Sequence, residues 1–197
     1  MHISEGILSG PVLLSGAALA AAGTAIGLKR LDYDRIAQTG ILAAAFFVAS
    51  LIHVPVGPSS VHLILNGIVG LILGWAAFPA ILTALVLHAL FFQFGGITTL
   101  GVNTLIMALP AVCCHYLFAS LIRRQGWMVS AGAFGCGFLA VALSALIMAG
   151  SLVFTEIKFL EISGLVLIAN FPVMVIEGII TVFCVLFLKN VQPELIA

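Results

Sequence analysis

The chain has 197 residues, of which 63% are hydrophobic and only 7% are charged, and its formal net charge is zero. Soluble domains carry about 25% charged residues, so this composition excludes an ordinary soluble monomer and predicts an integral membrane protein. Since there is no basic excess, nothing indicates a nucleic-acid partner.

Seven apolar runs predict seven membrane-spanning helices, because crossing a bilayer core takes about 20 apolar residues. The runs are continuous rather than alternating, which indicates helices, and a helix satisfies its own backbone in lipid. The expected spans are residues 8–28, 36–54, 60–77, 79–94, 101–122, 128–152 and 163–188. The third and fourth are short, so we expect either to be tilted, re-entrant or partly buried by the others. The predicted fold is an all-α, polytopic membrane helix bundle that forms one domain over residues 1–197.

The basic residues predict the orientation, because lysine and arginine favour cytoplasmic loops. With seven crossings and an external amino terminus, six of the seven fall inside, namely Lys29, Arg30, Arg35, Arg123, Arg124 and Lys189. Only Lys158 falls outside. The first residues carry Glu5 and no basic residue, which argues against a cleaved signal peptide. We therefore predict a retained external amino terminus, a cytoplasmic carboxyl terminus and residence in the cytoplasmic membrane.

Small residues line one face of the first predicted helix. Gly16, Ala20, Gly23 and Gly27 recur at spacings of four, three and four, and such small residues allow helices to approach closely. We expect this face to pack against other helices of the same chain rather than against a partner.

The start of the chain predicts a metal site. The α-amine of Met1, which we expect to be retained, the backbone nitrogen of His2 and its imidazole can wrap one divalent ion in fused chelate rings. Such a nitrogen set suits Ni(II) or Cu(II), and Co(II) can also be held. A fourth ligand is expected from His62, at the top of the third span on the same side of the membrane. His53, on the other flank of the Pro55–Ser60 turn, is the competing candidate.

Two further ionisable residues, His88 and Glu177, lie near the middle of their predicted spans. Such residues cost about 2.5–3.5 kcal/mol at a helix centre on insertion scales and usually pair inside the bundle. We expect them to approach each other or to share a polar network below the metal. They are also the proton site that a self-sufficient secondary metal carrier would use.

Several blocks of the sequence resemble the CbiM/NikM family, the substrate-binding S components of cobalt and nickel energy-coupling-factor transporters. The blocks are MHISEG at residues 1–6, VP at 54–55, SSVH at 59–62, GGITTLGVNT at 95–104, IEG at 176–178, FLK at 187–189 and PEL at 193–195. The resemblance implies a cobalt or nickel ion as transported substrate, with no organic cofactor. It also implies metal ligation by Met1, His2 and His62, with Thr99 and Asn103 near the site to orient the ligands. The block at 95–104 looks closer to cobalt members.

The sequence contains no HExxH, Walker or GxSxG motif, so we predict a transporter subunit and not an enzyme. The missing phosphate-binding loop means that ATP-driven uptake takes its energy from other chains. The resemblance names them as a transmembrane coupling (T) subunit, two ATP-binding subunits and, in some systems, a small accessory membrane subunit. The alternatives are the secondary carrier with His88 and Glu177 as its proton site, and a purely structural subunit without metal affinity.

Overall fold

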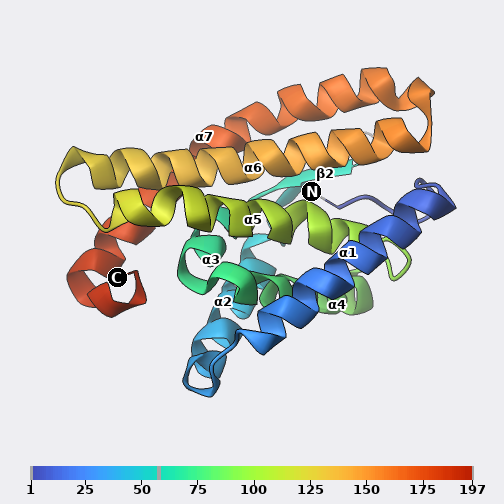
Figure 1. Ribbon diagram of the computed structural model, residues 1–197. Helices are drawn as coiled ribbons and strands as arrows, with labels where there is room; N and C mark the ends of the chain where they lie inside the picture. Colours follow the sequence, from blue (N-terminus) through green and yellow to red (C-terminus); the bar gives the residue numbers. More distant parts are fainter. Residues whose placement is uncertain (1, 57–58, 197) are drawn as a thin grey trace.

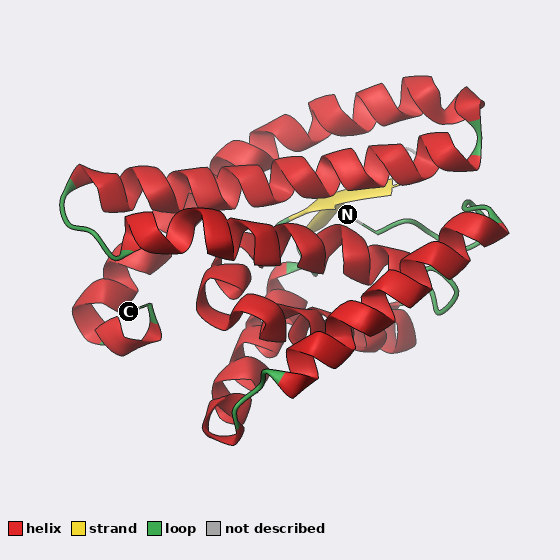
Figure 2. Ribbon diagram, in the orientation of Figure 1, coloured by secondary structure: helices red, strands yellow, loops and turns green. Residues whose placement is uncertain are grey.

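The computed structural model describes residues 2–56 and 59–196, and nearly all of this part of the chain is helical (Figure 1). The α-helices are α1 (Gly10–Lys29), α2 (Ile36–Ala49), α3 (Asn66–Leu73), α4 (Ala77–Phe92), α5 (Leu100–Ile122), α6 (Trp127–Thr155) and α7 (Leu160–Val191). Short 3₁₀ turns are η1 (Tyr33–Arg35), η2 (Gly74–Ala76), η3 (Ile157–Phe159) and η4 (Pro193–Leu195). A hairpin of two antiparallel strands, β1 (His53–Val56) and β2 (Ser59–His62), joins α2 to α3 (Figure 2).

Five segments of the described chain are long and apolar enough to cross a membrane. They are α1, the run Asn66–Phe92, α5, α6 and the run Ile157–Val191. Helix α2 has 14 residues and so spans only about 21 Å, less than a bilayer core. Large apolar side chains, including Leu14, Phe154 and Phe183, are exposed on the outside of the bundle. Because such a surface is stable in lipid rather than in water, the chain is an integral membrane protein.

The predicted helices 36–54 and 60–77 are wrong at the ends that face each other, over residues 50–54 and 60–65. Helix α2 ends at Ala49, and the chain then forms the hairpin, in which His53 pairs with His62 and Val54 with Val61. A short apolar run rich in β-branched residues suits a strand as well as a helix, and hydrophobic periodicity alone does not separate the two. The strands also accept Pro55, because both strands of a two-stranded hairpin are edges.

The predicted break between the spans 60–77 and 79–94 is also wrong. The chain turns at Gly74, which has φ +55°, a conformation that glycine adopts without strain. Pro79 lies in the first turn of α4, where the backbone N–H groups have no intrahelical partner and a proline costs little. The fourth helix therefore begins two residues before the predicted span.

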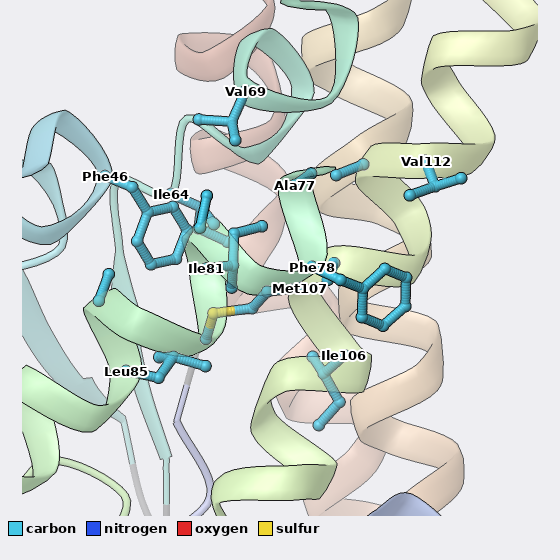
Figure 3. Close-up of a cluster of buried hydrophobic side chains, with 14 of the residues drawn as sticks. Phe46, Ile64, Val69, Ala77, Phe78, Ile81, Leu85, Ile106, Met107 and Val112 are labelled. Carbon is cyan, nitrogen blue, oxygen red and sulfur yellow. The ribbon is translucent and has the colours of Figure 1, made fainter. Parts of the chain in front are cut away.

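Helix α3 lies at the centre of the bundle, and all eight of its residues are buried. Around it, Ile64, Ile81, Ile106 and Met107 belong to one apolar core built from several helices (Figure 3). Burial of the short third span by other helices was one of the predicted outcomes, and the structure confirms it for α3. This placement brings the end of β2, just before α3, into the interior of the protein.

The small-residue face of α1 packs within the chain, as predicted. Gly16 lies against Val102 of α5, and Gly23 lies against the ring of Phe78 in α4. Neither position has room for a Cβ atom. The close approach fixes α1 across α4 and α5 (Figure 1), so the segment before α1 enters the bundle at the amino-terminal end of α5.

Candidate metal centre

The amino-terminal segment lies inside the protein. His2 is 5% exposed and Ile3 is 1% exposed. Asn103 of α5 binds the segment through both ends of its amide. The Ile3 N–H donates to Asn103 Oδ1 at 2.9 Å, and Asn103 Nδ2 donates to the Ile3 carbonyl at 3.1 Å. Asn103 Nδ2 also donates to Thr99 Oγ1 at 3.2 Å, which holds the amide in this orientation and so fixes the backbone beside His2.

The turn between α4 and α5, which contains Gly95 and Gly96, lies against the amino-terminal segment. The Glu5 N–H donates to the Gly95 carbonyl at 3.0 Å, and Glu5 Oε1 accepts bonds from the Thr98 N–H at 2.9 Å and the Thr98 hydroxyl at 3.2 Å. These bonds hold the pKa of the exposed Glu5 carboxyl below its usual value. Gly95 has φ +78°, and a Cβ there would lie 2.7 Å from Asn103 Nδ2. Both the backbone and the available space therefore require glycine.

Three imidazoles from separate elements meet at this point. The centroid of the His2 ring lies 4.7 Å from that of His62, at the end of β2, and 5.4 Å from that of His88 in α4. His62 is 2% exposed and His88 is fully buried. The ring of Phe94 lies 6.2 Å from His2 and 6.1 Å from His88, which adds an apolar wall to the group.

The protonation of His62 is set by its neighbours. Its Nδ1 lies 2.9 Å from the carbonyl oxygen of Leu63. A carbonyl only accepts, so Nδ1 carries the proton and Nε2 keeps a lone pair. Burial lowers the pKa of His62 to about 4; the bond to Leu63 opposes this fall and the nearby His88 adds to it. His62 is therefore a neutral nitrogen donor, the form that binds metals.

Glu177 of α7 holds the backbone that follows His62. Its Oε1 accepts bonds from the N–H groups of Ile64 and Leu65, the second at 2.8 Å. Leu65 has φ +56°, so the chain bends sharply there before α3 begins. A carboxylate at a helix amino terminus is favourable, because it satisfies N–H groups that have no intrahelical partner. Glu177 thereby fixes the position of His62 from the opposite side of the interior.

Five of the predicted site residues lie together, and two others fall outside the part that the structure describes. The side chains of His2, His62, His88, Thr99 and Asn103 lie together at the buried amino-terminal segment. Met1 and the side chain of His53 lie outside the described residues, so their roles stay predictions. In the described ranges, no three His, Cys, Asp or Glu side chains are close enough to hold a metal ion by themselves.

His88 and Glu177 form hydrogen bonds to different partners, and their predicted approach or shared polar network stays a prediction. His88 Nε2 lies 2.9 Å from the carbonyl oxygen of Phe47, whereas Glu177 bonds to the backbone after His62. Both are buried rather than lipid-facing, and both adjoin the group that contains His62. Sequence reasoning could not find Phe47, because its contribution is a backbone carbonyl that any residue would offer.

A comparison with known protein families shows to which family the chain belongs. The family model for CbiM, described as the cobalt uptake substrate-specific transmembrane region, matches residues 2–195. The chain belongs to the CbiM family. The family consists of transport proteins for cobalt and nickel, so the predicted resemblance to CbiM/NikM proteins is confirmed.

Individual relatives agree with this assignment. A putative metal transport protein of Haemophilus influenzae is 47% identical over 201 residues, which cover 98% of this chain and 96% of that protein. The cobalt transport protein CbiM of Geobacter sulfurreducens is 30% identical over 214 residues, covering 100% of this chain and 62% of that protein. The fused nickel transport protein NikMN of Rhodobacter capsulatus is 30% identical, covering 100% of this chain and 64% of that protein.

A solved structure shares the fold. The crystal structure of a truncated transition metal transporter superposes with a TM-score of 0.84 over 96% of this chain and 99% of that one, at 23% identity. The two chains therefore share the same overall fold.

Proposed function

We propose that the chain is the S component of an energy-coupling-factor importer that takes up cobalt(II) or nickel(II). One observation carries the proposal, namely that His2 and His62 are buried with their rings 4.7 Å apart although 60 positions separate them in the sequence. A buried histidine beside the start of the chain is unusual for a free terminus. It is expected if the terminus is part of a binding site.

The proposed ligands are the amine of Met1, the backbone nitrogen and imidazole of His2, and Nε2 of His62. The bond from Nδ1 of His62 to the Leu63 carbonyl fixes the ring and makes Nε2 the nitrogen with the lone pair that a metal ion would use. Asn103 holds the carbonyl and N–H of Ile3, so the backbone next to His2 is positioned before the ion arrives. Such preorganisation lowers the entropy cost of binding.

The distribution of charged residues supports an external amino terminus. Lys189 Nζ donates to the carbonyls of Ile122 and Arg124 at 2.7 and 2.6 Å, so basic residues of α7 and the α5–α6 turn lie together. The Ser9 N–H donates to Thr155 Oγ1 at 3.2 Å, which places the amino-terminal segment beside the other end of α6. Because basic residues favour the cytoplasm, the metal site faces outward in the cytoplasmic membrane.

Uptake in this proposal depends on other chains. The sequence carries no phosphate-binding loop, so a T subunit, two ATP-binding subunits and, where present, a small accessory membrane subunit supply the driving energy. The names of its relatives as cobalt and nickel transport proteins support either ion as the substrate.

The rival secondary carrier uses His88 and Glu177 as a proton site. Within the described residues, His88 bonds to the Phe47 carbonyl and Glu177 to the backbone N–H groups just before α3, so the two have separate hydrogen-bond partners. Purified chain in liposomes with a proton gradient separates the two proposals. We expect no cobalt accumulation without the ATP-binding partners, and accumulation by the chain alone would establish the carrier.

Titration calorimetry of the detergent-solubilised chain with Co(II) and Ni(II) tests the site. We expect His2→Ala and His62→Ala to abolish measurable binding of both ions. His115→Ala is the matched control, because His115 lies elsewhere in α5 and bonds to the Leu71 carbonyl at 3.0 Å. Equal binding by all three variants would contradict the proposal.

A further inference from the structure

Two adjoining cavities lie at the end of the bundle that carries the α5–α6 turn, opposite to the amino-terminal segment. The first is an apolar groove of about 440 Å³ between α2, α3 and α7. The second is a polar cavity of about 350 Å³ lined by η1, α2, α3, the end of α5 and η4. Gln38, Ile72 and Leu195 line both spaces, so the apolar groove leads to the polar cavity. Both volumes lie in the range of small-molecule sites, about 300–1,000 Å³.

The apolar groove faces the surroundings of the bundle. Ile41 of α2 and Phe187 of α7 line it, and both side chains are exposed on the outside of the protein. The membrane-spanning run that includes α7 ends at Val191, and Gln192 also lines the groove. The groove therefore lies near the boundary of the bilayer core. An apolar groove on such a surface is a binding site for apolar ligands, and here acyl chains surround it.

The polar cavity carries more positive than negative charge. Arg35 and Arg123 line it together with one carboxylate, that of Glu194. Lys189 adds a further positive charge beside it, because its Nζ donates to the carbonyl of Ile122, which also lines the cavity. Basic pockets between helices on the cytoplasmic side of a membrane bind anionic lipid headgroups.

Hydrogen-bond donors lie where the two spaces meet. Arg35 Nε donates to Gln38 Oε1 at 3.2 Å and Arg35 Nη2 donates to the Ile72 carbonyl at 2.8 Å, which together use two of the five N–H groups of the guanidinium. Because a guanidinium only donates, the end of Gln38 that it contacts is the oxygen, and the other end is the NH₂ group. This Nε2 is buried and has no hydrogen-bond partner within residues 2–56 and 59–196. A buried donor of this kind is costly until an acceptor satisfies it, and a phosphate oxygen is a strong acceptor.

We propose that these two spaces bind one anionic phospholipid of the cytoplasmic leaflet, with its phosphate beside Arg35, Arg123 and Gln38 and an acyl chain in the apolar groove. The proposal goes beyond metal uptake and does not depend on it. The leaflet follows from the basic residues at this end of the bundle, which favour the cytoplasm. An acidic side chain of a partner protein would fill the polar cavity alone, whereas the adjoining apolar groove favours a lipid.

Native mass spectrometry of the full-length, detergent-solubilised chain tests the site. The probes are phosphatidylglycerol and phosphatidylcholine with identical acyl chains, each titrated at the same concentrations. We expect the wild type to retain one phosphatidylglycerol and to bind phosphatidylcholine at least about fivefold more weakly. This factor corresponds to about 1 kcal/mol, the contribution of one basic residue near an anionic membrane surface.

Three substitutions inside the cavity and one outside it separate a built site from general charge attraction. Arg35→Gln and Arg123→Gln should each weaken phosphatidylglycerol binding about fivefold. Gln38→Glu keeps the acceptor for Arg35 but replaces the unpaired NH₂ group by a carboxylate oxygen, so it should weaken binding by at least about tenfold. Arg124→Gln is the matched control, because Arg124 carries the same charge next to Arg123 but lines neither space, and its Nη1 contacts the sulfur of Met128 instead. The control should bind phosphatidylglycerol as the wild type does.

A competition arm identifies the source of the phosphate. Glycerol 3-phosphate carries the phosphate without acyl chains, and we expect it not to displace the lipid at equal concentration. Displacement would overturn the lipid proposal and assign the polar cavity to a small phosphate compound. Equal binding of the two lipids, or an equal loss in Arg124→Gln, would overturn it as general charge attraction. No retained lipid in the wild type would also overturn it, in favour of an acidic group of a partner protein. If Arg35→Gln does not fold, as judged by its elution profile, Arg123→Gln and Gln38→Glu decide the outcome.

Discussion

Asn103→Ala should weaken metal binding without unfolding the bundle. The substitution removes the acceptor for the Ile3 N–H and the donor to the Ile3 carbonyl, at 2.9 and 3.1 Å. If the segment stays in place, two buried backbone groups lose their partners, at about 1–3 kcal/mol each. The lower total, about 2 kcal/mol, corresponds to roughly 30-fold weaker binding at 1.4 kcal/mol per factor of ten. If the segment leaves its site, the loss is larger, because His2 leaves with it.

The assay is a calorimetric titration of Co(II) into Asn103→Ala, with Asn170→Ala as control. Asn170 is also a buried asparagine, 1% exposed, but its Nδ2 donates only to the Val166 carbonyl of its own helix α7, at 2.7 Å. We expect the control to bind cobalt as the wild type does. Binding by Asn103→Ala within about threefold of the wild type would refute the view that this side chain positions the amino-terminal segment.

Other residues of the site make similarly specific predictions. Glu177→Gln should lower the unfolding temperature in detergent, because two charge-assisted bonds become neutral ones, each weaker by about 1 kcal/mol; an unchanged midpoint would contradict its role in holding the backbone after His62. Gly95→Ala should weaken cobalt binding, since its φ of +78° and the nearby amide of Asn103 exclude a Cβ, whereas Gly164→Ala, in open space, should not. Burial lowers the pKa of His62 from 6.5 to about 4. Between pH 4 and pH 6.5, the His62 imidazole is therefore protonated in the unfolded chain and neutral in the folded chain. The stability that neutral His62 contributes is therefore complete above pH 6.5 and declines as the pH falls towards 4. Thermal melts over this pH range should show that the unfolding temperature of His62→Gln depends less on pH than that of the wild type. An equal dependence on pH would contradict this prediction.

The long helices were predictable because their cause is local. An apolar run of 20 or more residues has only one way to satisfy its backbone in lipid, so α1, α5, α6 and α7 follow from composition. The hairpin and the short α3 were not predictable in the same way. Their residues are as apolar as a membrane span, but they lie inside the bundle, where strand and turn backbones can be satisfied by neighbours such as Glu177.

The side chains of the site were predictable from the sequence, but their backbone partners were not. His2, His62 and Asn103 stood out as nitrogen donors or amides in specific blocks, and the structure brings them together. The partners that set their protonation were hidden, since the carbonyls of Leu63 and Phe47 are backbone atoms without a sequence signature. Ile3 was missed as an anchor, although an isoleucine between polar residues at the start of the chain is a signal for burial.

Crystals of the chain grown with cobalt(II), measured at the cobalt absorption edge, would locate the ion without reference to activity. We predict one strong anomalous peak within bonding distance of both the His2 imidazole and Nε2 of His62. A peak at another cluster, such as the adjacent thiols of Cys113 and Cys114, with none beside His2, would contradict the account.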